Sequence, residues 1–161
     1  MYKTTKINGE KTMNTKFHIA QKMSRYLDRE NIFSENQIRW LTYFNPDSKL
    51  RVQFAKRIGC SGVKEFYNFE DAKKVIDRMR QECIKDLMIV KVNYQPDGIA
   101  SFSILYELKY IIDVDDNAIS GSGCEDQFDI ESDAESHMRT YTDKERKHLF
   151  VNEIEVEEEL I

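Results

Sequence analysis

The sequence is poor in the residues that fix protein chemistry by covalent or metal bonds. Its 161 residues include only three cysteines, three histidines and two prolines. The cysteines are far apart and form no CxxC pair, so the sequence predicts neither a disulfide framework nor a zinc site. The histidines also lie in separate segments, without a second ligand at metal-binding spacing. The residues concerned are Cys60, Cys83, Cys124, His18, His137 and His148.

Long apolar runs are also missing. No stretch approaches the ~18 apolar residues that a membrane-spanning helix needs. The polar N-terminus has no apolar core of the kind found in signal peptides. We therefore expect a cytoplasmic protein with a flexible leader over residues 1–13, followed by a single domain over 14–161.

The remaining polar patterns do not form a known catalytic or ion-binding motif. Asp113, Asp115 and Asn117 stand where a calcium loop begins. However, its sixth and twelfth positions hold Ala118 and Cys124 instead of glycine and a bidentate carboxylate. The glycines and serines fit neither a phosphate loop nor a nucleophile elbow. We expect a non-enzymatic protein with no cofactor and no metal.

Charge is abundant and unevenly distributed along the chain. Residues 1–90 hold 18 Lys and Arg against 11 Asp and Glu, whereas residues 91–161 hold 6 against 18. The resulting net charges of +7 and −12 sum to the −5 of the whole chain. Such asymmetry indicates either electrostatic attraction of a partner or attraction between the two halves.

Apolar residues at helical spacing predict about four helices in the basic half, which we call the helical basic part, 14–86. The expected helices cover 14–29, 38–44, 46–58 and 69–86. Ser34 and Gln37 match a capping box before the second helix. The last helix has the clearest apolar stripe, and Asn68 precedes it as a cap.

Alternating apolar residues predict a β-hairpin over 87–112, with its turn at 96–98. A three-residue turn pairs Tyr94 with Ala100, Val92 with Phe102, and Val90 with Ile104, so the apolar faces coincide. A mobile acidic loop is expected over 113–140 and a C-terminal element over 142–161. There, Thr142 opens a second capping box, and 148–156 fits a third strand or a continuation of that short helix. The predicted fold is therefore α+β, an N-terminal bundle of about four helices packed on a small antiparallel sheet.

One short sequence pattern in the basic half resembles a pattern found in other proteins. The order of Gln37, Trp40 and Leu41, then Ala72, Ile76 and Met79, resembles small helical modules appended to phage recombination proteins. The likeness covers about fifty residues and implies no site residue.

Two binding hypotheses follow from the charges. In the first, a regulatory or inhibitory protein of phage or mobile-element accessory type engages another protein, plausibly one that handles nucleic acid, through the acidic C-terminal residues. Those residues are Glu153, Glu155, Glu157, Glu158 and Glu159.

In the alternative, basic faces of the helices 46–58 and 69–86 bind DNA or RNA directly. The residues of that set are Lys49, Lys56, Arg57, Lys73, Lys74, Arg78, Arg80 and Lys85. Oligomeric state is left open.

Overall fold

One long antiparallel sheet dominates the structure, a computed structural model that describes residues 4–7, 11–25, 27–34, 36–47, 51–58, 62–115 and 124–158. The strands of the described part are β1 (Thr4–Ile7), β2 (Lys11–Lys22), β3 (Ile38–Asn45), β4 (Arg51–Ala55), β5 (Leu87–Gln95), β6 (Gly98–Val114), β7 (Cys124–Phe128) and β8 (Leu149–Glu157). Its helices are α1 (Phe69–Gln81), α2 (Glu131–Met138) and α3 (Asp143–Arg146). The strand order is β4-β3-β2-β5-β6-β7, with β1 beside β2 and β8 beside β6.

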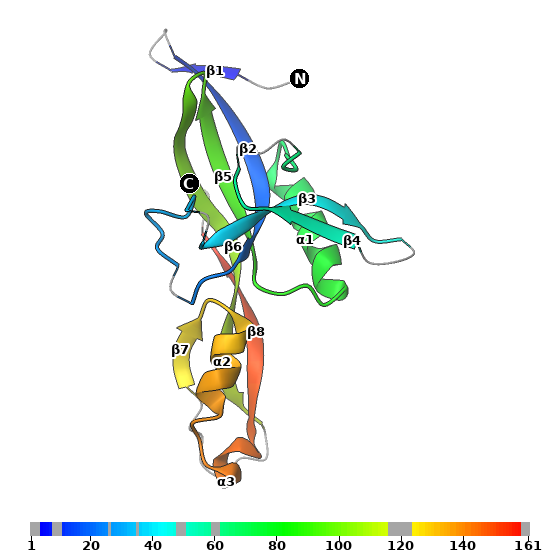
Figure 1. The fold of residues 1–161 in the computed structure, drawn as a ribbon, viewed down its shortest axis with the longest axis vertical. Coiled ribbons are helices and arrows are strands. Elements are labelled where there is room, and N and C mark those ends of the chain that lie inside the picture. Colours follow the sequence, from blue (N-terminus) through cyan, green and yellow to red (C-terminus); the bar gives the residue numbers. More distant parts are fainter. Residues whose placement is uncertain are drawn as a thin grey trace.

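Strand β6 joins an upper and a lower part of the molecule (Figure 1). Its first half, from Gly98 to Glu107, pairs with β5. Its second half, from Tyr106 to Val114, pairs with β8. The upper part therefore holds β1 to β5 and α1, whereas β7, β8, α2 and α3 surround the lower half of β6 (Figure 1).

Both faces of the upper sheet are covered. On one face, Ala72, Ile76 and Met79 of α1 are fully buried and pack against strand residues that include Ile19 and Ile89. On the other face, the connection between β2 and β3 supplies a second core. In that core the Phe33 ring stacks on Trp40 at 5.7 Å between centroids and meets the Phe102 ring edge-on at 4.8 Å.

The predicted N-terminal helix bundle is wrong, because three of its four helices are strands. The segments 14–29, 38–44 and 46–58 contain β2, β3 and β4. A strand that is buried on both faces carries consecutive apolar residues, and a short run of these also satisfies helical spacing. The Ser34 capping box is wrong too, since the Gln37 side chain accepts from the Asp28 amide and donates to the Asn31 carbonyl oxygen.

The fourth helix is confirmed as α1. The Asn68 side chain accepts from the Asp71 amide, as an N-cap does. The helix ends at Gln81, earlier than the predicted Asp86, and the chain then passes through Cys83 and Asp86 with positive φ. This tight exit brings the chain directly into β5.

The hairpin is confirmed, with a difference at its turn. Val92 pairs with Phe102 and Val90 with Ile104, as predicted. Near the turn, Gln95 pairs with Gly98 and Tyr94 with Ile99, so the loop has two residues and not three. A register shift between Asn93 and Tyr94 compensates and keeps the two apolar faces together.

The C-terminal region is more ordered than the sequence suggests. The predicted third strand is present as β8, and the Thr142–Glu145 capping box is confirmed at α3. Within the predicted mobile loop 113–140, however, β6 continues to Val114, and 124–138 contains β7 and α2. The predicted leader contains β1 and the beginning of β2. The likeness to helical modules is not supported, because Trp40 and Leu41 lie on β3.

Candidate interaction surface on strand β8

Ion pairs join α1 to β8 and connect the two oppositely charged halves of the sequence. Arg80 Nη2 lies 2.6 Å from Glu153 Oε1, and Arg80 Nη1 lies 2.6 Å from Glu155 Oε1. Lys73 also contacts Glu155, and Lys85 contacts Glu153. We call these five residues the α1–β8 seam. The charge asymmetry had two explanations, attraction of a partner and attraction between the two halves of the chain. These contacts show the second.

Tyr106 reinforces this seam from the sheet. Its hydroxyl donates to Glu155 Oε1 at 2.5 Å, while Lys73 Nζ lies 4.7 Å from the centre of its ring. The hydrogen bond from Tyr106, helped by the charges of Lys73 and Arg80, lowers the pKa of Glu155. Glu155 therefore stays ionised at neutral pH although it touches a buried tyrosine.

The other predicted site residues are scattered. Lys74 is exposed on α1, and Arg78 pairs with Glu82, the C-cap residue of that helix, at 3.2 Å. Lys56 and Arg57 are exposed just after β4. Glu157 and Glu158 are exposed at the end of β8. Lys49 and Glu159 lie outside the described residues. Three cations of the nucleic-acid set thus meet two carboxylates of the acidic set, and no single basic face is formed by the described residues.

The backbone of β8 has one paired and one open edge. The Glu158 amide donates to Leu105, and the Asp115 amide donates to the carbonyl oxygen of His148. Since inward and outward groups alternate along an antiparallel strand, even-numbered residues of β8 face β6. The odd-numbered residues therefore direct their amide and carbonyl groups outward. These are Leu149, Val151, Glu153, Glu155 and Glu157, and no described strand other than β6 pairs with β8.

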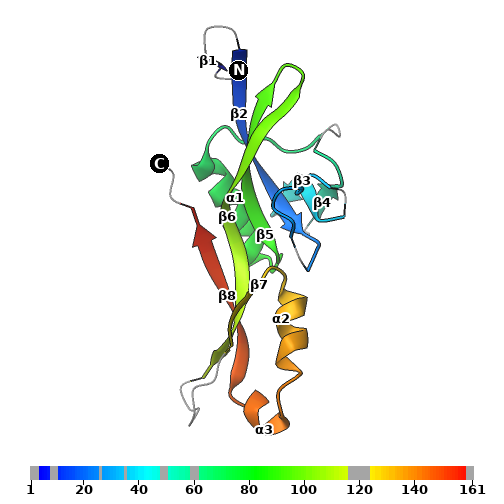
Figure 2. The same cartoon turned by 90° about the vertical axis from the view of Figure 1, so that its left-hand side faces the viewer.

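The glutamates are the main protection of this open edge. Proteins guard edge strands by shortening them, by bulges, by charged side chains, especially lysine, or by proline. Strand β8 is nine residues long, pairs with β6 without a register shift, and contains neither lysine nor proline. Figure 2 shows it along the outer side of β6, and α2 packs against both β6 and β8. A strand of this kind is a template for pairing with another extended segment.

The two sides of β8 differ in chemistry. Glu153 and Glu155 face α1, as their ion pairs show. Because side chains alternate, the even-numbered residues face the opposite side of the sheet. There, Phe150 is 43% exposed, and Ile154 and Val156 are partly buried. One side of the open edge is thus acidic and the other is mainly apolar.

A second charged cluster lies buried where the upper and lower parts meet. The fully buried Lys22 ammonium donates to the Leu108 carbonyl oxygen at 2.5 Å and lies 3.6 Å from Glu107. Arg29 and Lys109 also contact Glu107, and all three cations lie within 4.0 Å of Asp129. Burial lowers the pKa of Lys22, against the opposing effect of Glu107. We call these five residues the buried cluster.

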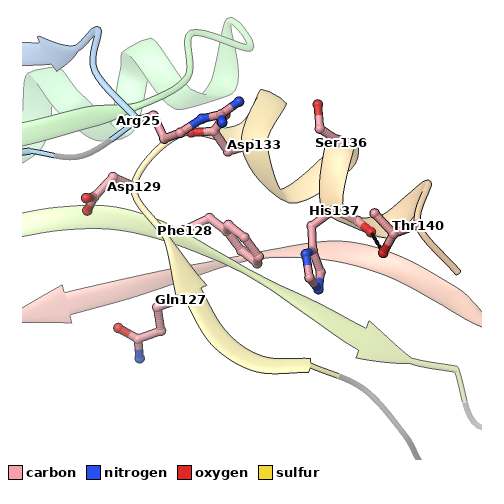
Figure 3. A pocket seen from close by; sticks show the side chains of 8 residues that line it. All are labelled: Arg25, Gln127, Phe128, Asp129, Asp133, Ser136, His137 and Thr140. Atoms are coloured by element: carbon pink, nitrogen blue, oxygen red, sulfur yellow. Dashed lines mark hydrogen bonds and ion pairs between the residues drawn. The ribbon is translucent and has the colours of Figure 1, made fainter.

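A cavity of about 450 Å³ opens between β7 and α2, beside the buried cluster (Figure 3). Phe128 and His137 line it, with their ring centres 5.4 Å apart. At its rim, Arg25 donates through Nε to Asp133 at 3.2 Å. The other carboxylate oxygen of Asp133 is buried without a hydrogen-bond partner.

This cavity does not bring a nucleophile to a base. Figure 3 shows the His137 ring pointing toward Phe128, whereas Ser136 points away from it on the other side of α2. Adjacent helical residues are about 100° apart around the axis, so a serine and a histidine at these positions cannot meet. The arrangement supplies no acyl-transfer chemistry.

His18 lies outside this cavity and has a structural partner at each ring nitrogen. His18 is buried, with Nδ1 2.9 Å from the Lys64 carbonyl oxygen and Nε2 2.7 Å from the Tyr94 hydroxyl. Within the described ranges, no three histidine, cysteine or carboxylate residues gather as metal ligands would. Over the same ranges, no helix has the length and apolar character needed to cross a membrane.

Compared with known proteins, the chain matches no family model, no curated protein and no solved structure. Sequence reasoning identified the acidic residues of β8 but missed its open edge and its apolar side. The alternation of Val151, Glu153 and Glu155 with Phe150, Ile154 and Val156 was the signal that could have revealed the apolar side.

Proposed function

We propose that the protein is a non-enzymatic binding protein that captures an extended segment of another protein on the open edge of β8. The outward-facing backbone groups of the odd-numbered β8 residues carry this proposal. Backbone pairing supplies the affinity in this recognition mode, and the flanking side chains supply the specificity. A regulatory or inhibitory role fits such capture, because a bound segment is withheld from its other contacts.

The charge distribution supports a protein partner over a nucleic acid. Lys73, Arg80 and Lys85 form ion pairs with the carboxylates of β8. Phosphate binding at α1 would have to compete with Glu153 and Glu155. The surface beyond the seam, with Glu157 and Glu158, is acidic and repels a phosphate backbone.

The proposal is tested by removing one outward amide from β8. In Val151→Pro the lost N–H faces away from β6, so no bond of the β6–β8 ladder is broken. Val151→Ala is the matched control, because it removes much of the side chain and keeps the amide. A partner that co-purifies with the wild type from extracts of the source cells should be retained by Val151→Ala and lost with Val151→Pro.

Two results would count against this function. Equal retention of the partner by Val151→Pro, with circular dichroism showing an intact fold, would mean that the edge is not used. Binding to duplex DNA at low salt, lost in Lys74→Glu with Arg78→Glu and steeply weakened by added salt, would instead support direct nucleic-acid binding.

A further inference from the structure

The two sides of the β8 edge define the class of segment that fits it. A strand added to β8 places its own side chains alternately beside those of β8 on the two faces of the sheet. On the α1 side its neighbours are Val151 and then Glu153, Glu155 and Glu157. On the other side its neighbours are Phe150, Asn152, Ile154 and Val156.

The acidic side carries more negative than positive charge. Lys73, Arg80 and Lys85 are the cations of the seam, while Asp77, Glu131, Glu153 and Glu155 lie within 4.0 Å of one or more of them. On this side Glu157 adds an exposed carboxylate beyond these contacts, and the exposed Glu158 follows it just after the end of β8. Glu155 keeps 46% of its side chain exposed despite its three partners. This surplus favours cations on the incoming strand.

The apolar side has the opposite preference. Phe150, Ile154 and Val156 leave apolar surface in solvent, and a charged neighbour placed over these side chains would lose hydration. Apolar neighbours would bury this surface.

We propose that the bound segment is an extended strand that alternates basic and apolar residues. This inference rests on the function proposed above. Its lysine or arginine side chains lie beside Glu155 and Glu157, and its apolar side chains cover Ile154 and Val156. A second copy of this chain does not fit equally well, because its own β8 would add glutamates to a side that already has an excess of them.

Three synthetic peptides distinguish the effect of the order of basic and apolar residues from the effect of their amino-acid composition. The first alternates lysine and valine, the second has the same composition in two blocks, and the third alternates glutamate and valine. Each is titrated into the full chain while backbone amide shifts are followed by NMR. The alternating lysine peptide should bind saturably and shift the β8 amides. The other two should bind at least about tenfold more weakly, since a single misplaced charge costs about that factor.

A charge-reversal pair gives the matched protein variants. Glu157→Lys with Glu158→Lys should weaken the alternating lysine peptide about tenfold and strengthen the glutamate peptide. Asp47→Lys with Asp97→Lys makes the same change in net charge at exposed positions after β3 and in the β5–β6 turn, away from β8, and should leave both affinities unchanged.

The outcomes distinguish this inference from the broader function. Equal binding of the block peptide, or equal effects of the two charge-reversal pairs, would mean non-specific attraction and would overturn the inference. If no peptide binds while the natural partner is still lost with Val151→Pro, the inference fails and the function stands. If the partner is indifferent to Val151→Pro, the proposed function fails, whatever the peptides do.

Discussion

The buried cluster and the α1–β8 seam use the same residue types with different consequences. In the buried cluster, Lys22 is sealed between Glu107, Asp129 and a carbonyl oxygen. In the seam, Glu153 and Glu155 are partly open to solvent, and further carboxylates follow them along β8. The centre of the first arrangement, Lys22 with Glu107, is closed to solvent and serves the fold, whereas Arg29 at its edge is 42% exposed. The second arrangement keeps exposed negative charge at an open strand edge, where a bound partner strand can contact it.

The largest effect is expected from breaking the buried cluster. Glu107→Gln keeps the side-chain volume but removes the carboxylate nearest to the buried Lys22 ammonium. Leaving a buried charge without its counter-ion should lower the free energy of unfolding by about 3 kcal/mol or more, measured by urea denaturation. Adding Lys22→Met should recover part of the loss. A change below about 1 kcal/mol would mean that the cluster is hydrated and open like the seam.

A smaller effect is expected from breaking the seam. Arg80→Ala removes the cation shared by Glu153 and Glu155. Because these groups are partly exposed, the free energy of unfolding should fall by only about 1 kcal/mol. The same denaturation measurement checks this value. A loss as large as that of Glu107→Gln would erase the distinction between the two clusters.

The smallest effect is a pH dependence that belongs to the seam. The pKa of Glu155 is lowered by the Tyr106 hydrogen bond and by Lys73 and Arg80. The folded state therefore prefers the carboxylate, so its contribution is present above the ordinary pKa of 4.5 and is lost as pH falls through the lowered value.

Glu155→Gln isolates this contribution. The stability difference between the wild type and this variant should be constant near neutral pH and should shrink as the solution is acidified below about pH 4.5. Thermal unfolding across this range measures it. A difference that grows on acidification would contradict the assigned direction of the pKa shift.

The sequence predicted α1, which is covered on one side only. Helix α1 has a single apolar stripe and a cap at Asn68, so its period is unambiguous. In β2, by contrast, Phe17 and Ile19 face α1 while His18 and Ala20 face the other core. Burial on both faces removed the alternation that distinguishes a strand from a helix, and the same happened at Trp40 and Leu41 of β3.

The candidate site was predicted in part for a related reason. The acidic residues of β8 stood out by composition. Their contacts with Arg80 and Lys85 span more than sixty positions in the sequence, so only the tertiary fold could show that the opposite charges meet. The open edge likewise depends on where β8 lies in the sheet, which no local pattern encodes.

The central claim, that β8 offers unpaired outward amides, is tested most directly by residue-resolved amide hydrogen exchange on the free protein. The amides of Val151, Glu153 and Glu155 should exchange rapidly, while those of Asn152, Ile154 and Val156, which face β6, should be protected by the ladder. Equal protection of both sets would show that the outer edge is already covered, and the proposed capture of a partner strand would then be untenable.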